Sequence, residues 1–353
     1  VRPMQSVTVS APGKLVLFGE YAVLFGAPAA VAAVDRRAVV TLAPSAGDDR
    51  QVMAPGLVER PVGLIAGHGN SVRWVDEAAR DAFGLVEKLF EGLQGSIDLQ
   101  GLPPLSMTLD TRSFFESAEG DRAKLGLGSS AALTVALAGA LEGWAGGELD
   151  EDSMVRLQRY VDLHRAVQGG AGSGIDVAAS TLGGVVRFRL AEDRTIAEAE
   201  ELVLPEMLCL VFVWTGRSAS TGDFLGRLRA RRKENPGEVN PILDQLGALS
   251  SAGVDALTGD DLGAFLSAVD TFWAALDRLG QAIDMPILSD DHRDLRRMAD
   301  ECGVHYKPRG AGGGDIGIGF GVEGEAIDAF RLHVETGGYV VVDLSIDPTG
   351  LVS

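Results

Sequence analysis

A glycine- and serine-rich loop in front of an apolar helix is the strongest chemical signal in the sequence. It reads Lys-Leu-Gly-Leu-Gly-Ser-Ser-Ala-Ala from Lys124 and leads into an apolar run that ends near Trp144. Glycines let backbone N–H groups converge on an oxyanion, and the helix N-terminus adds partial positive charge. Ser129 and Ser130 can donate to phosphate, and a hydroxyl can also coordinate a metal ion. The loop lacks the Gly-Lys-Ser/Thr end of a Walker A motif, and an ordinary loop with a serine N-cap is the alternative.

Two charged side chains stand beside other glycine turns. In Ser10-Ala-Pro-Gly-Lys14 a lysine leaves a constrained Pro-Gly turn, where it can act as a fixed point charge. In Gly172-Ser-Gly-Ile-Asp176 a carboxylate can accept a proton from a hydroxyl nucleophile. The alternatives are a solvated lysine in a surface turn and an aspartate that caps a helix. A further loop, Gly310-Ala-Gly-Gly-Gly-Asp315, brings backbone close to a ligand or to the first loop, unless it is only a hairpin turn.

The charge balance restricts the partners. The net charge of −19 repels nucleic acid and anionic membrane surfaces, so neither is expected as a partner. The same net negative charge repels nucleotides, so a nucleotide site in this protein needs local cations. Basic residues do lie in or beside the motifs: Lys14, Arg122, Lys124, Arg217, Lys307 and Arg309. Of these, Arg122 and Lys307 are expected to be solvated surface charges.

The elements that must position these motifs mix strands and helices. Strands are predicted over 6–10, 14–18, 29–42, 105–109, 183–190, 207–214 and 316–322, with a break at Ala11-Pro12-Gly13. Helices are predicted over 75–93, 131–144 and 154–167, through charged segments between 221 and 302, and at the start of 334–345, which then becomes a strand. Because regular βαβ alternation is missing, an α+β fold is favoured over a doubly wound sheet. The acidic stretch 192–201 suggests domains at 1–190 and 191–353.

Length and cysteine content limit the class of protein further. The chain of 353 residues, 46% of them hydrophobic, can bury one large core or two ordinary ones. Cys209 and Cys302 stand in unrelated contexts, so a disulfide framework is excluded and a reduced, cytoplasmic setting fits. The apolar segment 131–141 is too short to span a bilayer, and residues 1–14 lack a signal-peptide layout. We expect a soluble protein.

The order of the glycine motifs resembles that of the GHMP kinases. Ala-Pro-Gly-Lys near the start, Gly-Leu-Gly-Ser-Ser-Ala-Ala before a helix, and a late Gly-Ala-Gly-Gly-Gly-Asp match the signature motifs of that family in its own order. The resemblance covers essentially the whole chain. It implies an N-terminal domain like ribosomal protein S5 domain 2 and a ferredoxin-like C-terminal domain, with the active site between them. It also implies Mg²⁺-dependent transfer of the ATP γ-phosphoryl group to a small molecule.

Further details resemble the phosphomevalonate kinase branch of the family. These are Lys124 directly before the loop, Gly174-Ile-Asp-Val-Ala-Ala179, and Val213-Trp-Thr-Gly-Arg-Ser-Ala-Ser-Thr221. The reaction implied is phosphorylation of (R)-5-phosphomevalonate to 5-diphosphomevalonate, in the mevalonate route to isoprenoids.

Carried over residue by residue, the resemblance implies a set of site residues. Lys14 and Asp176 would be catalytic. The phosphates of ATP would be bound by Lys124, Gly126, Leu127, Gly128, Ser129, Ser130 and Ala131. The acceptor would be bound by Lys14, Tyr21, Ser173, Gly174, Thr215, Arg217, Ser220, Gly312 and Gly313.

The metal ligands implied by the resemblance depart from the wider family. Mevalonate kinases have a glutamate ligand of Mg²⁺ about eleven residues before the aspartate, and Arg165 occupies that position here. Ser130 and Gln168 would be the ligands that remain. His164 and Gln168 share a helix face at i, i+4 spacing, and the alternative for His164 is a packed helix histidine.

Other functions stay open at this point. A mevalonate kinase shares the fold and reaction type but has a hydroxyl acceptor, whereas the Trp-Thr-Gly stretch and Lys124 favour a phosphate acceptor. A sugar kinase of the same family, the ATP-using decarboxylase relative and a non-catalytic sensor are weaker alternatives. The expected partners are small molecules, and the protein is expected to be a monomer or a homodimer.

Overall fold

Two long antiparallel strands form the centre of the first half of the chain. In this computed structural model, which describes residues 5–45, 47, 49–118, 121–146, 152–170, 172–218 and 221–353, β1 (Val7–Phe18) pairs with β2 (Ala29–Pro44). The predicted break at Ala11-Pro12-Gly13 is wrong, because β1 continues through it with a register shift between Pro12 and Gly13. Proline lacks an N–H donor, and a bulge is a position where the ladder tolerates that loss.

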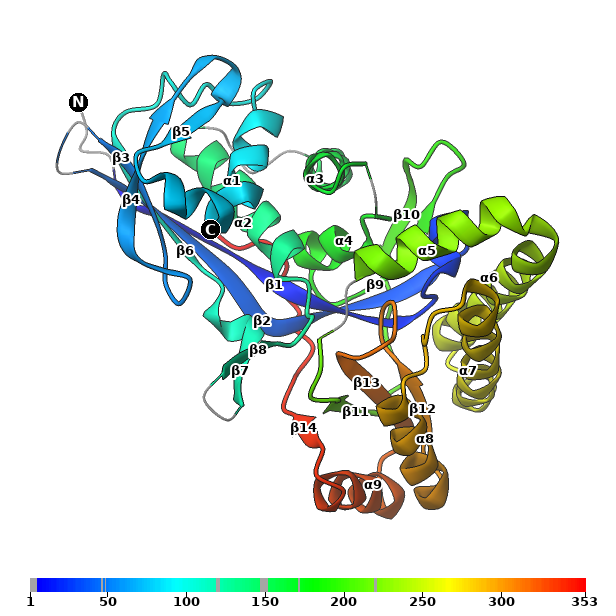
Figure 1. The fold of residues 1–353 in the computed structure, drawn as a ribbon. Coiled ribbons are helices and arrows are strands. Elements are labelled where there is room, and N and C mark those ends of the chain that lie inside the picture. Colours follow the sequence, from blue (N-terminus) through cyan, green and yellow to red (C-terminus); the bar gives the residue numbers. More distant parts are fainter. Residues whose placement is uncertain are drawn as a thin grey trace.

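A mixed sheet of eight strands is built around this pair (Figure 1). The strand order is β10-β9-β2-β6-β3-β4-β5, and β1 pairs with β2 beside this path. The further strands are β3 (Arg50–Ala54), β4 (Val58–Ala66), β5 (Val72–Trp74), β6 (Leu105–Asp110), β9 (Val185–Leu190) and β10 (Ile196–Glu201). Only the β3–β6 pair is parallel among the described strands of this sheet. The acidic stretch therefore contains a strand, β10, that sequence patterning did not predict.

Four helices of the first half lie on one face of this sheet (Figure 1). They are α1 (Arg80–Gly92), α2 (Ser129–Trp144), α3 (Ser153–Val167) and α4 (Ile175–Leu182). Helix α2 is apolar around most of its circumference and packs on β1 and β2, and most of its residues are buried. A small hairpin of β7 (Phe115–Ala118) and β8 (Asp121–Lys124) leads directly into the glycine-serine loop.

The second half contains a four-stranded antiparallel sheet. Its order is β12-β13-β11-β14, formed by β11 (Leu208–Trp214), β12 (His305–Pro308), β13 (Ile316–Val322) and β14 (Val340–Val342). With α8 (Asp290–Cys302) before β12 and α9 (Glu325–Thr336) before β14, the connectivity is the βαββαβ of ferredoxin-like domains. The long helices α5 (Thr221–Glu234), α6 (Pro236–Thr258) and α7 (Leu262–Ile283) are inserted after β11. The expected α+β class is confirmed.

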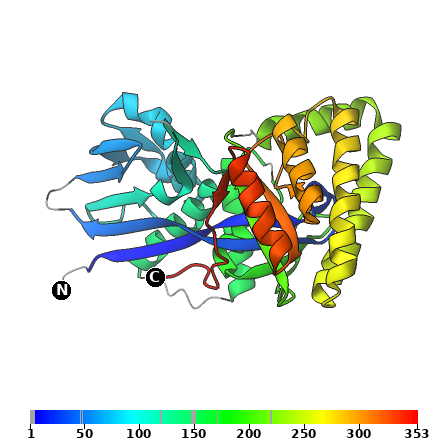
Figure 2. The same ribbon diagram turned by 90° about the horizontal axis from the view of Figure 1, so that it is seen from below.

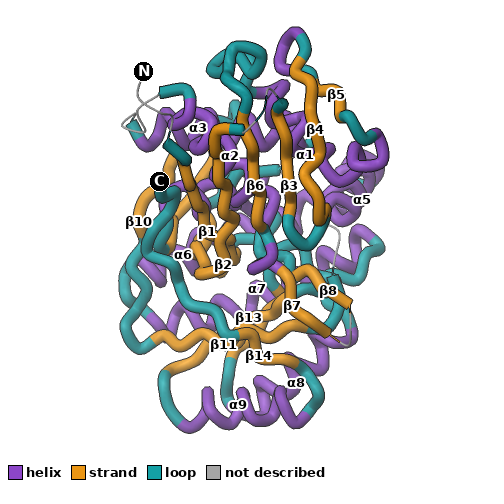
Figure 3. The backbone as a smooth tube through the Cα atoms, turned by 90° about the vertical axis from the view of Figure 1, so that its left-hand side faces the viewer, coloured by secondary structure: helices purple, strands orange, loops and turns teal. Residues whose placement is uncertain are grey.

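The two halves share one apolar core. Figure 2 shows β1 and β2 running from the first half toward the helices of the second. At the end of β1 the ring of Phe18 packs 4.6 Å from that of Phe272 and 5.5 Å from that of Phe265, both on α7. Phe265 in turn contacts Phe320 of β13, with ring centroids 5.4 Å apart. Figure 3 shows the smaller sheet below the large one.

Helix ends are fixed by local capping groups. Asp152 caps α3, Asp261 caps α7 and Ser289 caps α8, each through its side-chain oxygen. Gly303 ends α8 in the left-handed conformation that favours glycine. Across the described part of the chain, every helix is too short or too polar to cross a membrane.

Candidate active site

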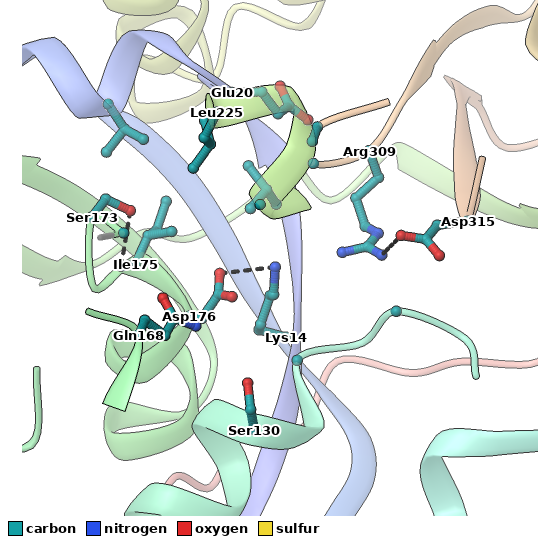
Figure 4. Close-up of a pocket in the computed structure, with 18 of the residues that line it drawn as sticks. Lys14, Glu20, Ser130, Gln168, Ser173, Ile175, Asp176, Leu225, Arg309 and Asp315 are labelled. Carbon is teal, nitrogen blue, oxygen red and sulfur yellow. Dashed lines mark hydrogen bonds and ion pairs between the residues drawn. The ribbon is translucent and has the colours of Figure 1, made fainter. Parts of the chain in front are cut away.

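A cleft of about 520 Å³ lies where the two halves meet, and the predicted motifs converge on it (Figure 4). Its walls are the middle of β1, the glycine-serine loop, the turn before α4, the first turns of α5, and the loop between β12 and β13. These segments are far apart in the sequence. The cleft is therefore a product of the whole fold.

The glycine-serine loop packs tightly against two cationic side chains. Gly126 and Gly128 have φ values of 72° and 78°, which favour glycine. A Cβ atom on Gly128 would lie 2.8 Å from Lys14 Cγ, and one on Gly126 would lie 2.4 Å from Arg309 Nη2. The Leu127 carbonyl accepts a 2.8 Å hydrogen bond from the Lys14 N–H, which ties the loop to the edge of β1. Next to the N-terminus of α2, this loop is a suitable anion site.

Lys14 and Asp176 form an ion pair on one wall of the cleft. Lys14 Nζ lies 2.8 Å from Asp176 Oδ1, and the lysine is only 7% exposed. Burial lowers the pKa of Lys14 because it disfavours the charged form, and the nearby Asp176 carboxylate partly opposes this shift. Asp176 lies in the first turn of α4, where the helix dipole also favours a negative charge. The pair thus holds an ammonium group at a fixed point.

Ser130, His164 and Gln168 meet beside this pair. Ser130 Oγ lies 3.3 Å and Gln168 Nε2 lies 3.2 Å from the same atom, His164 Nε2. Burial lowers the pKa of His164 and so favours the neutral ring, in which Nε2 can accept a hydrogen bond when the proton is on Nδ1. A Ser130 hydroxyl that donates to this nitrogen keeps its oxygen lone pairs for a cation.

Arg165 does not take the place of a metal ligand. Its Nη2 donates to the Ser173 carbonyl over 2.8 Å, and Arg194 Nη2 donates to the Gly172 carbonyl over 2.6 Å. Both arginines therefore hold the glycine turn in front of α4. Within the described residues no group of three or more His, Cys, Asp or Glu side chains could hold an ion alone. Mg²⁺ is commonly held by few protein ligands together with substrate phosphates, and Ser130 and Gln168 fit such a partial set.

The remaining predicted residues fall into two groups. Lys124, Tyr21, Ser173 and Gly174 line the cleft, as do Gly126, Gly128 and Ser129. The buried Tyr21 hydroxyl donates to the Ala311 carbonyl over 2.6 Å, and burial raises its pKa, which keeps the proton in place.

The second group lies outside the lining of the cleft. Leu127 and Ala131 are buried beneath the loop. Thr215 supports the third glycine loop, which comprises residues 310–315, through Asp315. Gly312 and Gly313 of this loop pack against Ile287 and Phe224. Arg217 is 77% exposed at its side chain and faces Asp291. Ser220 lies outside the described residues.

Lys307 corrects an expectation from the sequence. It was expected on the surface, yet it is fully buried and its Nζ pairs with Glu20, which is buried too. Burial of a lysine needs such a partner, and the partner is remote in the sequence. The side chain of Arg122, expected at the surface as well, lies outside the described part.

Sequence reasoning missed three lining residues on α5, Gly222, Leu225 and Arg229. Helix α5 has several arginines, so its sequence is typical of a solvated helix. Their position depends on how α5 lies across the cleft, and no local pattern signals it.

Comparison with known proteins agrees with this geometry. The family model described as the N-terminal domain of GHMP kinases matches residues 88–184. A curated phosphomevalonate kinase of Streptomyces sp. (strain CL190) is 30% identical over 370 residues, covering 97% of this chain and 97% of that protein. A mevalonate kinase of Thermococcus sibiricus (strain DSM 12597 / MM 739) is 27% identical over 355 residues, covering 96% of each.

A solved structure shows the same fold. The Streptococcus pneumoniae phosphomevalonate kinase in complex with phosphomevalonate and AMPPNP superposes with a TM-score of 0.74 at 19% identity. The match covers 97% of this chain and 99% of that one. The shared fold thus extends over both halves of the chain.

Proposed function

Because this chain belongs to the GHMP kinase family, we propose that it transfers the γ-phosphoryl group of ATP to (R)-5-phosphomevalonate. The chain is a kinase of the mevalonate route, and members of the family bind ATP. The product would be 5-diphosphomevalonate. Both the Streptomyces relative and the Streptococcus structure are phosphomevalonate kinases, which supports this acceptor.

The observation that carries the proposal is the balance of charge in the cleft. Each lining carboxylate has a basic partner: Asp176 with Lys14, Asp315 with Arg309, and Glu20 with Lys307. Lys124 and Arg229 also line the cleft, and among the described residues neither forms an ion pair. This surplus of positive charge occurs in a protein with a net charge of −19. Two anionic ligands, ATP and a phosphorylated acceptor, need such a surplus.

The Lys14–Asp176 pair suits a phosphate acceptor. Phosphoryl transfer depends on positioning and charge stabilisation more than on covalent help from the protein. An acceptor phosphate is largely deprotonated at neutral pH, since its second pKa is about 6. It can attack without a general base. Lys14 then neutralises the oxygens that approach one another, and Asp176, 2.8 Å away, orients the ammonium group.

Mg²⁺ would neutralise charge on the ATP phosphates when bound. Ser130, at the start of α2, and Gln168, at the end of α3, would contribute protein oxygens to it. His164 would act on Ser130 through the hydrogen bond between them.

Phosphorylation of mevalonate itself is the second candidate. It is favoured by the mevalonate kinase of Thermococcus sibiricus, whose 27% identity nearly equals that of the phosphomevalonate kinase. In that reaction the acceptor is a hydroxyl group, so Asp176 would have to accept its proton.

A substrate panel tests the proposal. Initial rates of ATP consumption are measured with mevalonate, 5-phosphomevalonate, 5-diphosphomevalonate and several sugars, and the product is identified by phosphorus NMR. We expect the highest kcat/KM with 5-phosphomevalonate, and loss of turnover when EDTA removes Mg²⁺. Faster turnover of mevalonate would overturn this acceptor and leave the family unchanged.

A further inference from the structure

Arg309, one of the basic residues beside the motifs, is a buried cation in the cleft to which the proposed mechanism assigns no specific role. It follows β12 directly, is only 3% exposed, and lines the cleft. A guanidinium group has five N–H donors. Among the described residues, the side chain of Arg309 nevertheless makes a single hydrogen bond, from Nη2 to Asp315 Oδ2 at 3.4 Å, and its buried Nε has no partner there. Since buried arginines are normally well paired, this side chain has donors available for a ligand.

The position of Arg309 indicates which ligand this is. Its Nη2 lies beside Gly126 at one end of the glycine-serine loop, while Lys14 lies beside Gly128 at the other. Figure 4 shows Lys14 between Asp176 on one side and Arg309 on the other. An anion held by the loop and the N-terminus of α2 would therefore have a cation on each flank.

We propose that Arg309 binds the phosphates of the nucleotide at the glycine-serine loop, as a cation supplied by the C-terminal half of the chain. This inference rests on the proposed kinase function but does not depend on the identity of the acceptor. In this arrangement Lys14, paired with Asp176, would stand between donor and acceptor, and Arg309 would contact the donor phosphates alone. The planar guanidinium group of arginine can donate two parallel hydrogen bonds to two phosphate oxygens at once.

The third glycine loop sets the position of this arginine. Asp315 holds Arg309 Nη2, and its own backbone is fixed at φ 60° by its neighbours. Its N–H donates to the Arg217 carbonyl over 2.6 Å, and its carbonyl accepts from both the N–H and the hydroxyl of Thr215 at 2.9 Å. Asp315 is therefore a positioning residue, and the loop keeps the guanidinium in place before any ligand arrives.

Binding of Mg·AMPPNP in the absence of any acceptor tests the proposal. Titration calorimetry on the full chain compares the parent with Arg309→Met and Arg309→Lys. Loss of a charge-assisted contact should weaken AMPPNP binding about tenfold or more in Arg309→Met. The AMPPNP affinity of Arg309→Lys should lie between those of the parent and Arg309→Met, because lysine keeps the charge but lacks the paired N–H donors of the guanidinium. Arg297→Met, an exposed arginine on α8, is the matched control and should bind as the parent does.

Kinetics separates this role from a structural one. In Arg309→Met we expect kcat/KM for ATP to fall by about 10²-fold, in line with loss of one preorganised electrostatic contact. Asp315→Asn should lower kcat/KM for ATP less, because Arg309 is still present but its side chain is held less firmly. If Arg309→Met does not fold, Arg309→Lys and Asp315→Asn carry the same comparison.

Two results would overturn the assignment. One is AMPPNP affinity and kcat/KM for ATP within twofold of the parent in Arg309→Met and Arg309→Lys. The other is an increase only in the KM of the acceptor, which would place Arg309 on the acceptor instead. If the substrate panel favours mevalonate, the acceptor is revised and the AMPPNP result still decides the role of Arg309.

Discussion

The charge of Lys14 depends on its surroundings. Burial makes the charged form of Lys14 harder to maintain, and the Asp176 carboxylate 2.8 Å away compensates in part. Arg309 shifts the lysine pKa in the same direction as burial, since two cations close together repel. The pKa of Lys14 therefore depends on residues from two other segments of the chain, α4 and the loop after β12.

This balance predicts a shift in the pH profile of Asp176→Asn. Because the mechanism needs Lys14 as a cation, kcat should decline as pH rises through the lysine pKa, which lies below its ordinary value of 10.5. Asp176 opposes that depression, so Asn at this position should lower the lysine pKa further and move the alkaline limb to lower pH. Plots of kcat against pH for the two proteins measure the shift.

Lys14→Met is the control for that profile. The pH profile of this variant should have no alkaline limb. Its kcat should be lower by about 10²-fold or more, the usual effect of losing one preorganised electrostatic contact. An alkaline limb that stays in place in Asp176→Asn, with loss of an acidic limb instead, would identify Asp176 as a general base.

Single residues also show where sequence reasoning succeeds. Lys14, Ser130 and Asp176 could be predicted because each stands beside glycines in a short motif, and the fold brings all of them to the cleft. Lys307 could not, because its burial depends on Glu20, which is 287 positions away in the sequence. In the sequence alone, a lysine whose acidic partner is remote cannot be told apart from a solvated surface lysine.

At the scale of elements, β13 shows how one strand serves two layers. Ile316, Ile318 and Phe320 point into the large core, while the alternating glycines face the second core under α8 and α9. A Cβ on Gly317 would lie 1.7 Å from Tyr306 Oη, and one on Gly319 would lie 2.5 Å from Phe330 Cε1. Glycine is needed in this strand because aromatic rings occupy the space of its side chains.

Gly319→Ala should therefore destabilise the protein. The added methyl group must displace the Phe330 ring, and overpacking of this kind costs about 1–3 kcal/mol in free energy of unfolding. Gly84→Ala on α1, where nothing lies within 4 Å of the new Cβ, is the matched control. It should stabilise by about 0.5–1 kcal/mol through helix propensity. Urea unfolding of the variants measures both, and equal midpoints would contradict the packing argument.

Long elements were more predictable than short or irregular ones. The apolar pattern predicted β2, α2, α3 and β13 close to their observed bounds. It missed β10, whose residues are mostly acidic or alanine and which, among the described strands, pairs only with β9 at the edge of the sheet. The predicted helix over 75–93 begins as an α-helix only at Arg80, because Glu77–Ala79 before it form a 3-10 helix capped by Asp76.

At the scale of the whole molecule, the turn after β1 joins the two halves beside the cleft. Glu20 pairs with Lys307 of β12, and Tyr21 donates to Ala311 in the third glycine loop. Tyr21 has a φ of 61°, an unusual value for a residue with a Cβ atom, and such strain is found where the surrounding structure determines it. The segment that carries Lys14 is thereby linked to the loop that carries Arg309.

The buried Glu20–Lys307 pair predicts strong thermodynamic coupling. Lys307→Met would leave the Glu20 carboxylate buried without its cation, which typically costs about 3–5 kcal/mol in free energy of unfolding. Combining Lys307→Met with Glu20→Gln removes both charges, so the double variant should be more stable than the sum of the two single changes predicts.

A double-mutant cycle on urea midpoints measures this coupling. The exposed pair of Arg293 with Asp277, whose side chains are 50% and 28% exposed, is the control. The coupling free energy of this control pair should be about 0–1 kcal/mol, since water screens the two charges.

The KM values for ATP and acceptor should rise in Lys307→Met as well, because Glu20 lines the cleft and Lys307 precedes the third glycine loop. Additive single changes would show that the pair does not hold the halves together, and the aromatic contacts around Phe18 would then be the main link.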